Sequence, residues 1–159
     1  MFILLLHLYG IIQSEFTQQE AAVNVAFFLS PKSEIIYLTE NMTLRQAMEK
    51  MEHHRYQSLP ILTEDGHYVG VVTEGDLLWA FKNQPGFSFI DAAKMMLTDI
   101  PRHFHYDAVA IDQPMDSLID TAYRQSFVPV VDDTNTFIGL VKRSDIIRYF
   151  YRKSQQLSK

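Results

Sequence analysis

The sequence contains no cysteine, and its basic residues are too few to balance the acidic ones. The absence of cysteine excludes disulfide bonds and thiolate metal sites and fits a reducing compartment such as the cytoplasm. The 14 Lys and Arg residues stand against 19 Asp and Glu residues, giving a formal net charge of −5 at pH 7. This charge argues against electrostatic binding of nucleic acid. The apolar run at residues 1–12 is shorter than the roughly 20 residues needed to span a bilayer. We therefore expect a cytoplasmic protein that binds neither nucleic acid nor a membrane.

Motifs that mark catalysis are also missing. The sequence has no Gly-rich phosphate loop, no G-x-S-x-G motif and no Cys nucleophile. His103 and His105 would share one face of a strand, as two zinc ligands must, but no third ligand has suitable spacing. His53 and His54 are adjacent and point in different directions. We expect no enzymatic activity, no metal site and no required cofactor.

An internal repeat organises the chain. The segment Gly70–Leu77 reads Gly, two strand residues, a short polar turn, and an Asp that opens a new apolar run. The later segment Gly139–Ile146 has the same order of residue types. Pro60 and Pro129 are separated by the same number of residues as these two segments. This shared separation, here called the repeat distance, indicates an internal duplication. Units of roughly 60 residues are marginal alone, so we expect the two copies to pack on each other.

Each copy shows the pattern of a strand, a helix, two strands and a second helix. Thr43 and Gln46 form a capping box at the first helix, whose apolar residues recur at i, i+3, i+4 and i+7. In the second copy, Gln113-Pro114 is expected to begin the equivalent helix with proline in its first turn. The expected strands are 35–38, 58–62, 68–73, 109–111, 129–131 and 137–141; further helices are expected from Gly75, over 90–96, and from Asp145 to about Arg152.

The repeat also sets the expected domain boundaries. We expect the first copy over residues 23–84 and the second over 85–153, followed by a tail at 154–159. Residues 1–22 are a doubtful N-terminal extension. The codons of Gln19–Ala21 can contain a ribosome-binding sequence, so Val23 is a candidate translation start. The alternative is a short N-terminal helix packed on the domain.

A duplicated β-α-β-β-α unit with G-h-h-T-x-x-D-h after its last strand resembles the CBS domain, named from cystathionine beta-synthase. The resemblance covers about residues 24–152, and two tandem copies form the CBS pair, or Bateman module. It implies an α+β fold in which two CBS repeats pack about a pseudo-two-fold axis. The stretch Met96–Arg102 also looks like one in small stand-alone bacterial CBS pairs, some of which bind cyclic di-AMP.

The resemblance implies a function and a site. Such pairs bind an adenosine-containing nucleotide (AMP, ATP or cyclic di-AMP) in clefts between the repeats, and signal to a partner protein, here in trans. They commonly form homodimers, and a ligand-free dimerisation or interaction module is the alternative. In the family, the Asp of T-x-x-D binds the ribose hydroxyls and the Thr contacts ribose or phosphate. Asp76 and Thr73 match this pattern, and Asp145 matches with Lys142 in the place of the Thr.

These candidates have structural alternatives. Asp76 and Asp145 can cap their helices whether or not they bind ribose. Lys142 and Arg143 stand beside a helix N-terminus, which favours anions, whereas Glu74 repels a phosphate in the first copy. We therefore expect the second copy to bind phosphate better. The alternative for the two basic residues is a solvated turn.

Two aromatic and basic candidates complete the predicted ligand site. Tyr56, four residues before Pro60, is expected to stack on a base or line the cleft, and a core tyrosine is the alternative. Lys32 precedes the first strand, where family members place cleft residues, and it is a candidate partner for phosphate. A surface lysine is its alternative.

Overall fold

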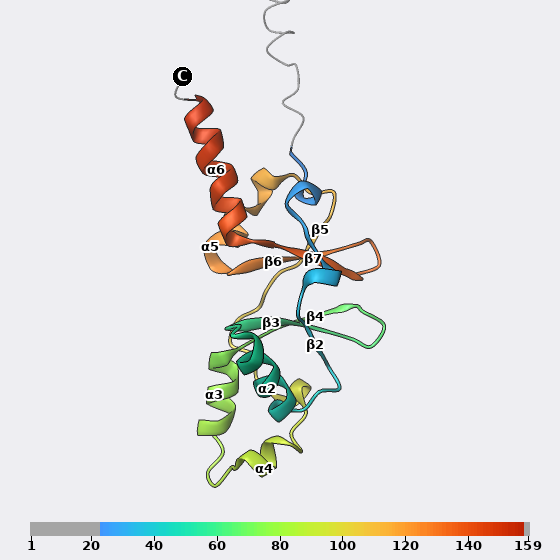
Figure 1. Ribbon diagram of the computed structural model, residues 1–159, viewed down its shortest axis with the longest axis vertical. Helices are drawn as coiled ribbons and strands as arrows, with labels where there is room; N and C mark the ends of the chain where they lie inside the picture. The colour runs from blue at the N-terminus through green and yellow to red at the C-terminus, as the bar shows by residue number, and fades with distance from the viewer. Residues whose placement is uncertain (1–22, 158–159) are drawn as a thin grey trace, which may run out of the picture.

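The computed structural model describes residues 23–157, whose two ends lie at the same end of the molecule (Figure 1). The N-terminal extension predicted at residues 1–22 lies outside this range. The described chain forms two stacked units, each with a small sheet and its own helices (Figure 1). This arrangement confirms the predicted α+β class with a repeated unit.

Seven strands within residues 23–157 form two sheets, one for each repeat. In both sheets a short strand pairs in parallel with the first strand of an antiparallel hairpin. The second sheet gains a strand from the start of the chain, because β1 pairs antiparallel with β7 and ties the first repeat to the second. The first sheet has the order β2 (Leu38–Thr39), β3 (Ser58–Leu62), β4 (Tyr68–Thr73), and the second has β1 (Ser30–Pro31), β7 (Phe137–Lys142), β6 (Phe127–Val131), β5 (Val109–Ala110).

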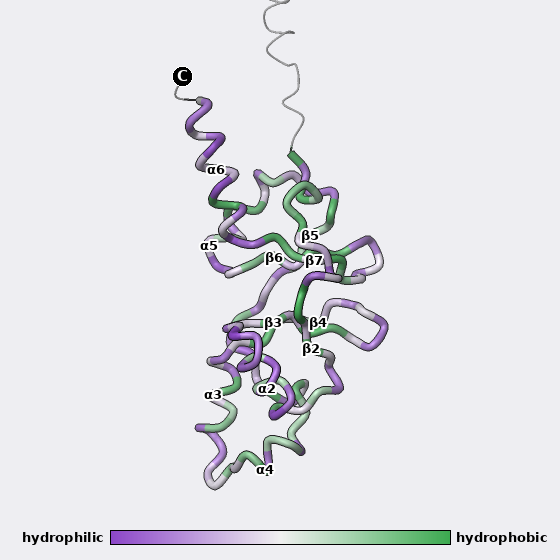
Figure 2. The backbone as a smooth tube through the Cα atoms, viewed as in Figure 1, coloured by the Kyte–Doolittle hydropathy of each residue, from purple (hydrophilic) through white to green (hydrophobic). Residues whose placement is uncertain are grey.

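The longer helices lie toward one side of the sheets (Figure 1). Hydrophilic residues mark the hairpin tips and the far end of the last helix (Figure 2). The α-helices are α2 (Leu44–His54), α3 (Glu74–Lys82), α4 (Phe89–Ala92), α5 (Ile119–Arg124) and α6 (Arg143–Leu157), and 3-10 helices occur at Val25–Phe28, Lys32–Glu34, Leu97–Asp99 and Met115–Leu118.

The first helix forms as its sequence predicts. The Thr43 side chain accepts the Gln46 N–H, and the Gln46 side chain accepts the Thr43 N–H, so the predicted capping box is confirmed. One face of α2 is buried in the first repeat through Leu44, Ala47 and Met51. Capping and burial thus act on the same eleven-residue helix.

Some predicted elements are wrong at their boundaries. The strand expected at 35–38 is displaced to Leu38–Thr39, because the preceding residues form a 3-10 turn that ends at Ile35. The helix expected to start at Gln113-Pro114 begins as the 3-10 helix Met115–Leu118. Pro114 is its N-cap and provides no side-chain acceptor.

The strand expected at 129–131 begins two residues earlier, at Phe127, and further corrections concern helix lengths. The helix expected over 90–96 ends at Ala92, and the chain then turns so that the Met95 carbonyl accepts the Leu44 N–H. The last helix begins at Arg143 and continues to Leu157, beyond the predicted end at Arg152.

Three groups of buried side chains hold the fold together. One fills the first repeat, a second fills the second repeat, and the third lies between the two sheets. The third group makes the repeats a single packed body, as expected for units too small to be stable alone. Its buried members are Leu62, Val71, Tyr106, Phe127, Phe137 and Leu140.

Candidate functional site

A cleft of about 400 Å³ lies between the two repeats. One wall comes from residues 55–57, which join α2 to β3 in the first repeat. The opposite wall comes from the second repeat, through Ser126 directly before β6 and through Leu140 and Lys142 of β7. Residues 34–36, which lead into β2, line the cleft as well. Because both repeats contribute walls, a change in their relative arrangement changes the cleft.

Contacts at the open ends of the two hairpins position these walls. Arg55 is the C-cap of α2, and its left-handed backbone (φ 57°) turns the chain toward β3. The Gln57 carbonyl accepts the Glu74 N–H at 3.0 Å, and the Ser126 carbonyl accepts the Arg143 N–H at 3.2 Å. The two donors, Glu74 and Arg143, are one repeat distance apart, and so are the two acceptors. The same contact therefore fixes the start of the second helix in each repeat.

The charged groups of the cleft favour an anion of low charge. Lys142 lies at the end of β7, directly before the N-terminus of α6, and Arg55 lies on the other wall. Glu34 adds one carboxylate, so the basic side chains of the lining exceed the acidic ones by one. The dipole of the 15-residue α6, whose N-terminus follows Lys142 directly, adds positive potential.

In the second repeat, Lys142 lines the cleft, whereas Arg143 and Asp145 lie in the first turn of α6 outside its lining. The Asp145 carboxylate accepts a hydrogen bond from Arg148 at 3.1 Å, and 24% of its side chain remains exposed. Asp145 therefore pairs along its own helix and stays accessible to solvent.

Thr73 and Asp76 lie at the junction of β4 and α3, away from this cleft. The Thr73 Oγ1 accepts the Asp76 N–H at 3.2 Å, and the Asp76 Oδ2 accepts the Thr73 N–H and hydroxyl at 2.9 and 2.7 Å. Asp76 is 2% exposed, and its Oδ1 accepts the His103 N–H at 2.9 Å. Both carboxylate oxygens are thus bonded within the protein. Helix capping, the structural alternative, is present, and the ribose contact stays a prediction.

Tyr56 and Lys32 have different surroundings. Tyr56 lines the cleft, is 47% exposed, and stacks on His54 with ring centroids 6.1 Å apart. The Lys32 Nζ lies over the Tyr37 ring, 5.5 Å from its centroid, and Lys32 is outside the cleft lining. The structure therefore brings Tyr56 and Lys142 together at the cleft, but not Lys32.

Several lining residues were not among the sequence predictions. Ser58 and Ser126 face each other across the repeats, with their hydroxyl oxygens 3.3 Å apart. Each directly precedes the apolar run that contains the repeated proline, and this position was the signal that was available. Arg55 gave no such signal, because only its backbone conformation and the neighbouring repeat place it at the cleft.

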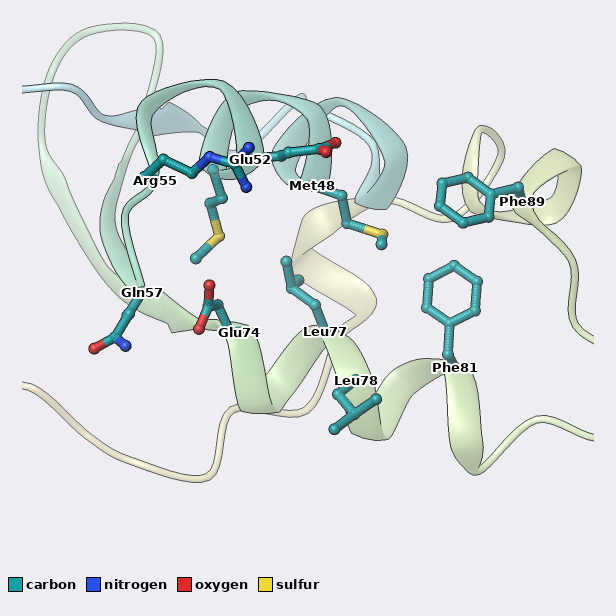
Figure 3. Close-up of a pocket in the computed structure, with 10 residues that line it drawn as sticks. Met48, Glu52, Arg55, Gln57, Glu74, Leu77, Leu78, Phe81 and Phe89 are labelled. Carbon is teal, nitrogen blue, oxygen red and sulfur yellow. The ribbon is translucent and has the colours of Figure 1, made fainter.

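A second, larger cavity of about 520 Å³ is a groove between α2 and α3 (Figure 3). Apolar side chains from both helices and from α4 line most of it (Figure 3). Arg55 and Glu74 stand at one end, and the Glu52 carboxylate lies nearer Met48 (Figure 3). Such an apolar helical groove suits a protein surface better than a phosphate ligand. Its apolar residues are Met48, Met51, Leu77, Leu78, Phe81 and Phe89.

Residues 23–157 also lack two features of other functional classes. These residues contain no cluster of three or more His, Asp or Glu side chains arranged to hold a metal ion. None of the helices in this part of the chain has the length and apolar character required to cross a membrane.

The repeated fold, with a cleft between the repeats, agrees with the comparisons of sequence. The CBS domain profile matches residues 27–83 and again residues 92–152. The chain therefore belongs to the CBS domain family and carries a tandem CBS pair.

Known proteins resemble this chain in sequence and in structure. L-aspartate semialdehyde sulfurtransferase of Methanocaldococcus jannaschii is 31% identical over 113 residues, which cover 69% of this chain and 20% of that protein. The chain spans about a fifth of the length of this relative. The CbpB protein of Listeria monocytogenes in complex with c-di-AMP has a TM-score of 0.72 and 15% identity, covering 83% of this chain and 98% of that chain. CBSX2 in complex with AMP has a TM-score of 0.62 and 20% identity, covering 86% and 99%. At these identities the structural likeness shows the fold.

Proposed function

We propose that this protein is a regulatory module that binds an adenosine-containing nucleotide in the cleft between its repeats. The observation that carries the proposal is the position of Lys142, which lines the cleft directly before the N-terminus of α6. A phosphate there meets a cation beside the positive end of the α6 helix dipole. Tyr56 supplies an aromatic face on the opposite wall, on which a base can stack. The complexes of CbpB with c-di-AMP and of CBSX2 with AMP support a ligand of this class.

The size and charge of the cleft narrow the choice of nucleotide. A volume of about 400 Å³ lies at the small end of ordinary ligand sites and suits one adenylate unit. Only one more basic than acidic side chain lines it, so a ligand with few phosphate charges is favoured over ATP. AMP and one half of cyclic di-AMP meet both conditions.

A thermal-shift panel with AMP, ATP, cyclic di-AMP and GTP tests this proposal. A ligand that binds only the folded state raises its melting temperature by mass action. We expect a shift with AMP or cyclic di-AMP, a smaller one with ATP and none with GTP. Lys142→Thr, which restores the family residue, should reduce the shift. The matched control is Lys32→Ala, since Lys32 lies outside the cleft. An equal loss in both variants, or no shift with any nucleotide, would reject the proposed site.

Regulation, rather than chemistry, is the proposed outcome of binding. The two serines of the cleft bond to each other, and Ser126 also bonds to the Tyr106 hydroxyl. No histidine is among the described lining residues. A ligand that bridges the two walls favours one relative arrangement of the repeats over others. A partner protein in trans would bind one arrangement of the repeats more tightly than the other.

A homodimer is the proposed assembly. Leu78 on α3 and Ile147 on α6 occupy equivalent positions of the two repeats and are 61% and 57% exposed. Exposed apolar side chains repeated in this way mark interfaces. Leu78→Glu and Ile147→Glu should each shift the sedimentation profile from dimer to monomer. Phe27 is also exposed (81%), but it lies on the 3-10 helix Val25–Phe28, outside α3 and α6. Phe27→Glu should leave the sedimentation profile unchanged. A dimer that binds no nucleotide would favour the interaction module.

A further inference from the structure

The pseudo-two-fold arrangement provides a second position equivalent to the Lys142 cleft, beside Thr73 and Asp76. Residues 100–106, here called the inter-repeat segment, occupy this position. The His103 N–H donates to the Asp76 Oδ1 at 2.9 Å, and Asp76 is almost fully buried. In a nucleotide site this carboxylate would accept hydrogen bonds from the ligand. Here it accepts one from the chain itself.

The inter-repeat segment is held at both ends and in its middle. Ile100 and Tyr106 are 3% and 8% exposed, so apolar burial anchors the two ends. The Arg102 guanidinium donates to the Val69 carbonyl at 3.2 Å, and the Tyr68 hydroxyl donates to the Tyr106 carbonyl at 2.8 Å. These bonds fix the segment along β4, the strand that leads to Thr73.

Some open space remains beside the segment, but it does not reach Asp76. A hollow of about 340 Å³ is lined largely by the segment itself, with Gly70 and Val71 of β4 behind it. Neither Thr73 nor Asp76 lines this hollow. A ligand therefore reaches the Asp76 carboxylate only if the segment moves.

The equivalent residues of the other repeat explain why one position is open and the other is filled. Tyr106 corresponds to Ile35 when β5 is aligned with β2, the first sheet strand of its own repeat. Ile35 lines the open cleft, whereas the larger Tyr106 is buried between the sheets. In the same alignment Lys32 corresponds to His103, and at the repeat distance Asp145 corresponds to Asp76. The Asp145 carboxylate, however, pairs with Arg148 on its own helix.

A short chain of hydroxyl groups joins the filled position to the open cleft. The Tyr106 hydroxyl and the Ser126 hydroxyl share a hydrogen bond of 3.0 Å, and the Ser126 N–H donates to the Tyr106 hydroxyl at 3.5 Å. The Ser126 and Ser58 hydroxyls are 3.3 Å apart, and both line the Lys142 cleft. A ligand group that bonds to Ser126 competes with the bond that holds Tyr106.

We propose that the inter-repeat segment is an internal occupant of the second nucleotide position, and that Ser126 couples its hold on Asp76 to binding in the Lys142 cleft. The chain then binds one nucleotide rather than two. The bound nucleotide loosens residues 100–106, whose middle residues face solvent. The occupancy by the segment is independent of any ligand, whereas the coupling rests on the proposed nucleotide function.

Amide hydrogen exchange of the ligand-free protein tests the occupancy. His103 is exposed and lies outside helices and strands, so without the Asp76 bond its amide should exchange rapidly. We expect protection of about tenfold or more at His103. Asp76→Ala should abolish it, and the matched variant Asp145→Ala should leave it unchanged. An unprotected His103 amide in the wild-type protein would overturn the proposal whatever the protein binds.

Calorimetric titration with AMP and with cyclic di-AMP gives the second readout. We expect one site per chain for AMP, and two equivalent sites would contradict an internally filled position. When the wild-type protein is saturated with nucleotide, the His103 amide should exchange faster than in the ligand-free protein. Ser126→Ala, at a nucleotide concentration that titration shows to be saturating, should show no such increase. An unchanged His103 rate in the saturated wild type would remove the coupling. Absence of binding by both nucleotides would reject the proposed function and the coupling, and leave the occupancy to the exchange result.

Discussion

Asp76 and Asp145 stand at the same turn of equivalent helices in the two repeats, but their carboxylates make different bonds. Asp76 is buried, caps α3 through the Thr73 N–H, and accepts the His103 N–H. Asp145 is partly exposed and pairs with Arg148, one turn along its own helix. Duplication has therefore produced one aspartate that holds the fold together and one that remains accessible.

This difference predicts unequal costs of removing the two carboxylates. Asp76→Ala removes a capping acceptor from a buried position and takes away the partner of the Thr73 and His103 N–H groups, so the free energy of unfolding should fall by about 2–4 kcal/mol. Asp145→Ala removes a partly exposed ion pair and should cost about 0–1 kcal/mol. Urea denaturation of both variants measures the difference. Equal losses would show that the Asp76 bonds contribute no more than the ion pair at the other site.

The sequence predicted elements that depend on neighbouring residues better than elements that depend on contacts between distant parts of the chain. β3 and β4 have the predicted bounds, Ser58–Leu62 and Tyr68–Thr73, because a tight turn and local apolar pattern define this hairpin. β2 was misplaced, since its position depends on pairing with β3 and on the 3-10 turn before it.

The candidate site divides in the same way. Tyr56 was predicted from its position four residues before Pro60, and Lys142 from its place in the motif that resembles the CBS family. The structure places both at the cleft. The contact between His103 and Asp76 joins two segments that are distant in the chain and belong to different repeats. No local pattern carries that information, so sequence alone left Asp76 as a ligand candidate.

The two glycines Gly139 and Gly75 predict opposite effects of alanine. A Cβ at Gly139 would collide with the Ser30 carbonyl, which is backbone of the paired strand β1 and has little freedom to move. We expect Gly139→Ala to lower the free energy of unfolding by about 1–3 kcal/mol. A Cβ at Gly75 meets only ordinary contacts of 3.6 and 3.9 Å in the first turn of α3. Gly75→Ala should raise stability by up to about 1 kcal/mol, as judged by thermal and urea unfolding. Destabilisation by both would contradict this distinction.

Phe137 offers a test of whether the repeats unfold together. It is 1% exposed and belongs to the buried group between the two sheets. Phe137→Ala should lower the free energy of unfolding by about 3–5 kcal/mol. Because the group joins the repeats, unfolding of the wild type should be one transition by circular dichroism and by Trp79 fluorescence. Non-coincident transitions in the wild type would show that the repeats are stable separately.

Tyr68 predicts a loss of stability in alkaline solution. Burial raises the pKa of its phenol well above the usual value, and the neutral hydroxyl donates to the Tyr106 carbonyl. In the unfolded chain a tyrosine ionises near its ordinary pKa of about 10. The stabilisation is thus fully present below about pH 10 and is lost as pH rises toward the folded-state pKa, because only the unfolded chain releases the proton.

Urea denaturation between about pH 8 and pH 11 checks this sign with Tyr68→Phe as the comparison. At the lower pH the variant should be less stable by about 1 kcal/mol, because it lacks the hydrogen bond. Above about pH 10 the wild type should lose up to about 1.4 kcal/mol per pH unit relative to the variant, and the gap should close. Tyr123→Phe is the control for the loss of a phenol, since the Tyr123 side chain is exposed to solvent. A gap between wild type and Tyr68→Phe that stays constant through this range would show that Tyr68 ionises equally in both states.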